Sequence, residues 1–125
     1  MMTGSVTAGR EAILRLTMHD ADGQEHAYDS VVDTGYTGTL TMPPNVIAAL
    51  GLRWHRAGRA VLADGSESKF DIYHGVVVWD GRPVIVRIDE MDADSLVGMS
   101  MMYGYELVLP VLDGATFTLR LIEKT

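Results

Sequence analysis

The triplet Asp33-Thr34-Gly35 is the part of this 125-residue chain best suited to chemistry. Two β-branched residues, Val31 and Val32, lead directly into it, so the carboxylate of Asp33 is expected at the end of a buried strand. At average amino-acid usage, such a triplet arises by chance about one or two times in a hundred chains of this length. It is also typical of an ordinary turn, in which the aspartate bonds its own backbone two residues on. The triplet alone leaves both interpretations open.

The chemistry available to such a carboxylate is the hydrolysis of peptide bonds by two aspartates that share one proton. Two carboxylates that lie so close cannot both ionise. The ionised member takes a proton from a water molecule, and the protonated member donates to the scissile carbonyl. The chain contains one Asp-Thr-Gly triplet, so a pair would require a second copy of the chain, with Asp33 on a two-fold axis.

Four Asp-Gly pairs predict the strands that must position this triplet. Asp-Gly between apolar runs predicts a β-hairpin, because both residues tolerate the positive φ of a type I′ turn. Strand-like sequence flanks every pair, at residues 12–18 and 25–32, 59–62 and 70–73, 76–79 and 84–88, and 106–109 and 116–121. The sequence therefore predicts a mostly antiparallel, all-β protein. The four pairs are Asp22-Gly23, Asp64-Gly65, Asp80-Gly81 and Asp113-Gly114.

Two segments predict short helices. Residues 43–51 begin with two prolines and end with glycine, which is the expected asymmetry of a helix. A second short helix is expected near Ser100, whose side chain would cap the turn through residues 101–103. The acidic run at residues 89–94 is expected to be a loose, solvated loop.

Composition limits the classes of function. A length of 125 residues with 47% hydrophobic residues predicts a single domain over residues 1–125. The net charge of −7 argues against nucleic acid and anionic membrane surfaces as partners.

There are no cysteines, the four histidines show no ligand spacing, and the acidic run lacks the glycine and terminal glutamate of a calcium loop, so we expect no metal and no cofactor. Residues 1–10 are polar and no run is long enough to span a membrane, so a cytoplasmic protein is expected.

Several motifs, in order, resemble the clan AA retropepsin-like aspartic proteases, and most closely their small bacterial branch. That branch has two hydrophobic residues, Asp-Thr-Gly, an aromatic residue and Thr-Gly, then Leu-Thr and a Pro-Pro helix, then Leu-Ala-Asp-Gly-Ser, and later two hydrophobic residues followed by Gly-Met and Tyr-Gly. The resemblance runs from about residue 9 to the C-terminus and implies a closed, retropepsin-like (acid protease) barrel with one or two short helices. The corresponding residues here are 31–38, 40–44, 62–66, 96–99 and 103–104.

The resemblance also implies roles for individual residues. Asp33 would be the catalytic carboxylate, Thr34 would bridge to its counterpart in the second subunit, and Gly35 would let the backbone approach the carboxylates. The hairpin at Asp64, Gly65 and Ser66 would be a flap that closes over the substrate. Residues 96–98 would thread beside the active-site loop.

One position departs from most of the family. Retropepsins and pepsins usually carry Ala or Ser directly after the triplet, whereas this chain has Tyr36. The small bacterial branch shares an aromatic residue there. We expect Tyr36 to border the substrate and to alter the hydrogen bonds around Asp33.

The function predicted from these residues is that of an aspartic endopeptidase, active as a homodimer on peptide or protein substrates. A dimeric peptide-binding or regulatory module on the same fold, with little turnover, is an alternative that Tyr36 favours. A third possibility is an interaction domain in which Asp33-Thr34-Gly35 is a structural turn.

Overall fold

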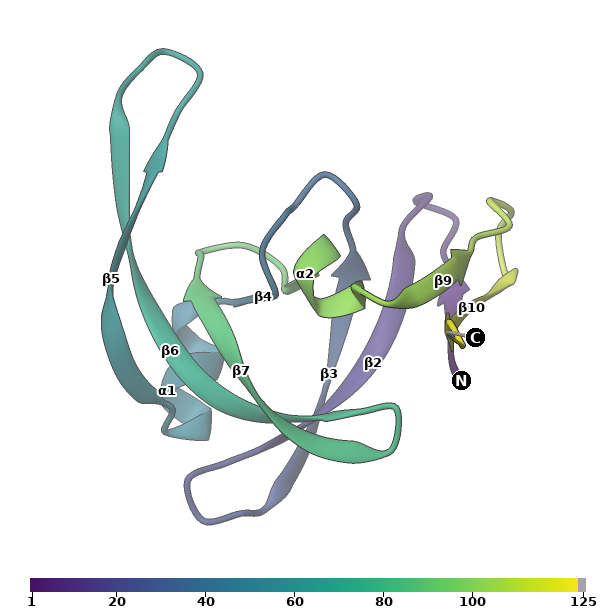
Figure 1. Ribbon diagram of the computed structural model, residues 1–125, viewed down its shortest axis with the longest axis horizontal. Coiled ribbons are helices and arrows are strands. Elements are labelled where there is room, and N and C mark those ends of the chain that lie inside the picture. The colour runs from purple at the N-terminus through teal and green to yellow at the C-terminus, as the bar shows by residue number, and fades with distance from the viewer. Residues whose placement is uncertain (124–125) are drawn as a thin grey trace.

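The computed structural model describes residues 1–123, which form ten strands and two short helices (Figure 1). The strands are β1 (Met2–Val6), β2 (Ala12–His19), β3 (Glu25–Val32), β4 (Leu40–Met42), β5 (Arg53–Val61), β6 (Glu67–Trp79), β7 (Arg82–Glu90), β8 (Leu96–Val97), β9 (Tyr105–Val108) and β10 (Thr116–Leu121). The helices are α1 (Pro44–Leu50) and α2 (Met99–Met102).

All the described strands belong to one sheet with the order β5-β6-β7-β4-β8-β3-β2-β1-β10-β9. An additional pairing between β6 and β2 closes β2, β6, β7, β4, β8 and β3 into a ring. The other four strands extend from that ring, so the closed barrel expected from the sequence forms only part of the sheet. Neighbouring strands are antiparallel except for β3 with β8 and β4 with β7. The all-β fold class is confirmed.

Hairpins form at all four Asp-Gly pairs, but the turn type was predicted correctly at one of them. Asp80 and Gly81 both have positive φ, 50° and 82°, as a type I′ turn requires. At the other three pairs only the glycine has positive φ. In all three the loop is longer, at residues 20–24, 62–66 and 109–115. Gly23 N donates to Asp20 O at 3.0 Å, and Gly65 N donates to Leu62 O at 2.9 Å. The strand regions predicted at 70–73 and 76–79 are a single long strand, β6.

The two predicted helices are confirmed, with one correction. α1 begins after Pro43 and ends at Gly51, which has a left-handed φ of 61°. α2 begins at Met99 and its N-cap is Gly98, so Ser100 does not cap it. The Ser100 hydroxyl donates instead to the carbonyl of Thr37. Within the described residues, no helix is long and apolar enough to cross a membrane.

The core is one cluster of buried side chains from the strands of the ring, from β1 and β10 and from both helices. β2 alternates buried and more exposed residues along its length, which is the period-2 pattern of a strand with one inward face. α1 covers the sheet with Ile47 and Leu50. The side chains with almost no exposed surface include Met18, Leu40, Met42, Ile72, Val77, Ile88, Val97, Phe117 and Leu119.

A buried threonine joins two of the shortest strands. The side chain of Thr41 in β4 is inaccessible to solvent, and its Oγ1 accepts a hydrogen bond of 2.9 Å from the backbone N–H of Leu96 in β8. β4 and β8 share only one backbone register pair, Leu40 with Val97. The hydroxyl therefore supplies an additional link between β4 and β8.

Replacing Thr41 tests this link. Thr41→Val keeps the shape of the side chain but leaves the partly buried Leu96 N–H without an acceptor, which should lower the free energy of unfolding by about 1–3 kcal/mol. Thr41→Ser keeps the hydroxyl and should lose less. Urea denaturation measures both variants, and a valine variant at least as stable as the serine variant would contradict the role of the hydrogen bond.

Candidate active site

Asp33 lies directly after the last residue of β3, beside the parallel strand β8. Val31 pairs with Leu96 and Val32 with Val97 in this ladder. The backbone N–H of Asp33 donates to the carbonyl of Val97 at 2.9 Å, which extends the ladder by one residue. Asp33 is thus fixed by backbone hydrogen bonds at the rim of the sheet, with its side chain half-buried.

The triplet itself forms a tight turn. Gly35 N donates to Asp33 Oδ1 at 2.8 Å, and Tyr36 N donates to Asp33 O at 3.2 Å. A Cβ on Gly35 would lie 3.2 Å from Asp33 Oδ1, so glycine permits this close approach. The bond expected of an ordinary turn is present, and it uses one carboxylate oxygen. Within residues 1–123, Asp33 Oδ2 receives no hydrogen bond.

The residues after the triplet are tied to the segment that begins α2. Three backbone bonds connect them: Gly98 N to Thr39 O at 2.9 Å, Met99 N to Tyr36 O at 2.8 Å, and Ser100 N to Gly38 O at 3.0 Å. A Cβ on Gly98 would overlap the carbonyl oxygen of Gly38. Residues 96–98 therefore lie beside the loop, as the resemblance implied, and the approach is close enough to require glycine.

Tyr36 directs its side chain toward the body of the sheet. Its hydroxyl donates to Asp89 Oδ2 at 2.7 Å, and Arg87 Nε donates to Asp89 Oδ1 at 2.8 Å. Burial raises the pKa of the Tyr36 hydroxyl far above its usual value, and the hydrogen bond to Asp89 raises it further. The hydroxyl consequently stays protonated and remains a donor at physiological pH.

Asp89 and Arg87 are residues that the sequence analysis missed. The whole run at residues 89–94 was expected to be a loose loop, but Asp89 belongs to β7 and is only 6% exposed. The expectation was wrong because acidic composition does not reveal which carboxylate has buried partners. One signal was available: Asp89 directly follows the apolar, alternating run at residues 84–88.

The β5–β6 hairpin projects away from the rest of the molecule (Figure 1). Asp64, Gly65 and Ser66 form its exposed tip. Asp64 Oδ1 accepts hydrogen bonds from the side chain and the backbone N–H of Ser66, and these bonds hold the pKa of the Asp64 carboxyl below its usual value.

A cavity of about 540 Å³ lies between the flanks of this hairpin, Tyr36 and the end of β7. The structure therefore brings Tyr36 together with the sides of the hairpin, and the three tip residues are not part of the cavity wall. The hairpin contributes Ala60, Leu62, Ser68, Lys69 and Phe70, and the remaining lining residues are Asp89, Glu90, Met91 and Asp92.

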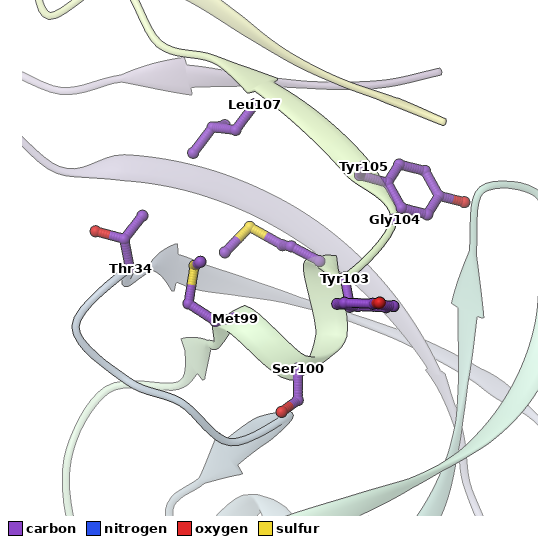
Figure 2. A pocket seen from close by; sticks show the side chains of 8 residues that line it. Thr34, Met99, Ser100, Tyr103, Gly104, Tyr105 and Leu107 are labelled. Atoms are coloured by element: carbon purple, nitrogen blue, oxygen red, sulfur yellow. The ribbon is translucent and has the colours of Figure 1, made fainter. Parts of the chain in front are cut away.

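A second hollow, of about 620 Å³, opens on another side of the same loop. Figure 2 shows Thr34, Met99 and Leu107 around this open space, with α2 forming its floor. Thr34 is exposed there, and Tyr103 is 85% exposed. About half of Met99 is accessible. The triplet therefore lies between two hollows, one bordered by Tyr36 and one by Thr34.

Among the described residues, no three histidine or acidic side chains are grouped closely enough to hold a metal ion.

Comparison with known proteins gives a likeness of fold. No family model matches the chain, and no curated protein matches it in sequence. Among solved structures, EIAV protease complexed with the inhibitor HBY-793 is similar, with a TM-score of 0.57 and 15% identity. The match covers 82% of this chain and 96% of the viral one. The chain thus has an all-β, retropepsin-like fold, the fold of a retroviral aspartic protease.

The close approach at Gly98 yields a prediction. Gly98→Ala would place a methyl group against the backbone of Gly38, which cannot move aside as a flexible side chain could, so the free energy of unfolding should fall by about 1–3 kcal/mol. Gly9→Ala is the control, because its Cβ would meet nothing closer than Thr7 Oγ1 at 3.6 Å and should change stability by less than about 0.5 kcal/mol. Equal stabilities in urea denaturation would contradict the steric argument.

Proposed function

We propose that this chain is one subunit of a homodimeric aspartic endopeptidase that hydrolyses peptide bonds with the Asp33 carboxylates of two copies and an activated water. The observation that carries the proposal is the position of Asp33, held at the end of β3 with one carboxylate oxygen bonded to Gly35 N. Each subunit would be a single domain spanning residues 1–125. The fold of EIAV protease supports the class of enzyme.

Each residue of the triplet would have a separate role. The two Asp33 side chains would share one proton, so that one takes a proton from water while the other donates to the scissile carbonyl. Thr34 would contact the partner subunit across the two-fold axis. Gly35 would orient Asp33 through the N–H···Oδ1 bond of 2.8 Å.

The surface around Thr34 supports pairing. Thr34 borders a hollow together with apolar side chains of Met99 and Leu107, and Tyr103 next to them is largely exposed. β9 is the last strand of the sheet, so its outer edge has no partner among the described strands. Exposed apolar side chains and a free strand edge beside the triplet are what a second copy could cover.

The opposite hollow supports a substrate site. Its wall combines Tyr36 with Leu62 and Phe70 from the hairpin, so an extended peptide could lie between the hairpin and the body. In this proposal Asp64, Gly65 and Ser66 form the flap tip that closes over bound peptide and excludes water. Tyr36 would contact the peptide through its ring, because its hydroxyl is already bonded to Asp89.

A dimeric peptide-binding module with little turnover is the second candidate. The same hollow favours it, because peptide binding needs the walls contributed by Tyr36 and the hairpin but not the carboxylate pair. Replacing Asp33 distinguishes the two candidates, since only the endopeptidase depends on it for activity.

Asp33→Asn should abolish peptide cleavage at every pH, with a loss of roughly 10³-fold or more. The wild-type protein should show a bell-shaped pH profile with an optimum below neutrality, because cleavage requires the pair to hold one proton. Asp29→Asn is a matched control, since Asp29 is an exposed aspartate on the same strand that pairs with Arg15 at 3.2 Å. Full cleavage activity in Asp33→Asn would end the endopeptidase proposal.

Assembly should respond to the same change. When both Asp33 carboxylates are ionised their repulsion opposes pairing, so wild-type dimers should weaken as pH rises. Asp33→Asn removes that charge and should dimerise at least as well as wild type near neutrality. Sedimentation analysis across pH measures this, and a wild-type protein that stays monomeric at micromolar concentration would contradict the homodimer.

The hairpin should be mobile if it acts as a flap. Its outer half, residues 59–69, is exposed almost throughout, so few contacts hold it to the body. We expect its backbone amides to exchange with solvent at least about 100-fold faster than those of Val31 and Val32. Hydrogen exchange in the free protein measures this difference, and equal protection of the two regions would argue against a flap.

A further inference from the structure

The side chain of Tyr36 is clamped between two glycines. Its ring lies so close to Gly38 that a Cβ there would overlap the ring and the hydroxyl. On Gly98, a Cβ would lie 2.6 Å from Tyr36 Cδ2. The ring therefore fills a space that is open only because both neighbours lack a side chain, and its direction away from the triplet is fixed by packing.

The hydroxyl at the end of this ring meets a carboxylate with two partners. Asp89 accepts from Tyr36 at one oxygen, at 2.7 Å, and from Arg87 Nε at the other, at 2.8 Å. Asp89 is buried, whereas Arg87 is partly exposed. A buried carboxylate is costly unless both oxygens are satisfied, so the three side chains are a mutually dependent set. We refer to Tyr36, Asp89 and Arg87 as the brace.

The brace connects the loop of Asp33 to the strands that carry the hairpin. Asp89 pairs with Ile72 of β6 on one side and with Thr41 of β4 on the other. β6 continues without interruption into the projecting hairpin. Tyr36 and Asp89 also form part of the wall of the cavity beneath that hairpin. A peptide bound there would rest against the brace.

We propose that Asp89 is a positioning residue that acts through Tyr36 to hold the loop of Asp33 in its reactive geometry. This inference rests on the proposed function. The backbone bonds of the loop tie it to residues 97–100, and the brace ties it to β7. Without the Tyr36–Asp89 bond the turn at residues 33–36 keeps its backbone bonds and the packing of the ring but loses its link to β7, and the Asp33 carboxylate moves relative to its counterpart and the substrate.

The test compares Tyr36→Phe, Asp89→Asn and the double variant with wild type. Tyr36→Phe keeps the ring between the glycines and removes only the donor, so it should fold even where Asp89→Asn does not. Both single variants should lower kcat roughly 10- to 100-fold with a smaller change in KM, because a misplaced reacting group costs rate more than binding. The double variant should lose no more than the worse single variant, since both changes break the same bond.

A second measurement does not require activity. The backbone N–H of Gly35 donates to Asp33 Oδ1, so a loosened turn should raise its hydrogen exchange rate, and NMR can follow that amide. We expect faster exchange at Gly35 in both single variants and an unchanged rate in the middle of β3. Tyr28→Phe and Asp29→Asn, adjacent positions on β3 outside the brace, are matched controls and should leave kcat and the Gly35 amide unchanged.

The outcomes separate the two proposals. A wild-type protein without peptidase activity, combined with faster Gly35 exchange in the variants, would end the proposed function while supporting the brace. Unchanged Gly35 exchange in Tyr36→Phe would overturn the brace, whatever the activity. A loss of kcat that merely follows the folded fraction, with KM and Gly35 exchange as in wild type, would also overturn it.

Discussion

Asp33 is held by a backbone hydrogen bond from its own N–H to the carbonyl of Val97, at the point where β3 ends beside its parallel neighbour β8. Backbone bonds of this kind do not depend on a particular side chain, so the position of the carboxylate is set by the ladder itself. Three more backbone bonds join residues 36–39 to residues 98–100. They can form only because Gly98 lacks a Cβ and allows the two backbones to approach. The rest of the candidate site is arranged around this junction.

The loop after β3 separates two different environments. On one side Thr34 borders a hollow formed by α2 and β9, where apolar side chains and a free strand edge are exposed. On the other side Tyr36 enters the body of the sheet and bonds Asp89, next to the strands that continue into the hairpin. This loop, residues 33–39, thus connects the surface at which pairing is proposed with the surface proposed to bind peptide.

The likeness to EIAV protease extends over 82% of the chain at 15% identity. Backbone pairing and a few glycines can preserve such a fold while most side chains differ, because the ladder bonds and close approaches involve main-chain atoms. For the same reason, a shared fold does not determine the positions of the side chains. In the proposed endopeptidase, catalysis would depend on where a second Asp33 lies relative to the first, to within a fraction of an ångström, and fold alone does not fix that.

The sequence by itself determined the four hairpins with the strands that flank them and the two short helices, because period-2 alternation, Asp-Gly pairs and the Pro-Pro entrance to α1 act locally. It also singled out Asp33-Thr34-Gly35, because β-branched residues lead into the triplet and the neighbouring motifs follow in a fixed order. It did not predict the short strands β1, β4 and β8, which form ladders with strands distant in the chain. It did not give the closing pair of β6 with β2, the edge position of β9 or the role of Asp89. These depend on contacts between residues far apart in the chain, such as Tyr36 with Asp89, for which local composition carries no signal. Only the tertiary structure decided that one carboxylate of an acidic run is buried against a tyrosine and an arginine, because burial is a property of the packed chain and not of the run itself.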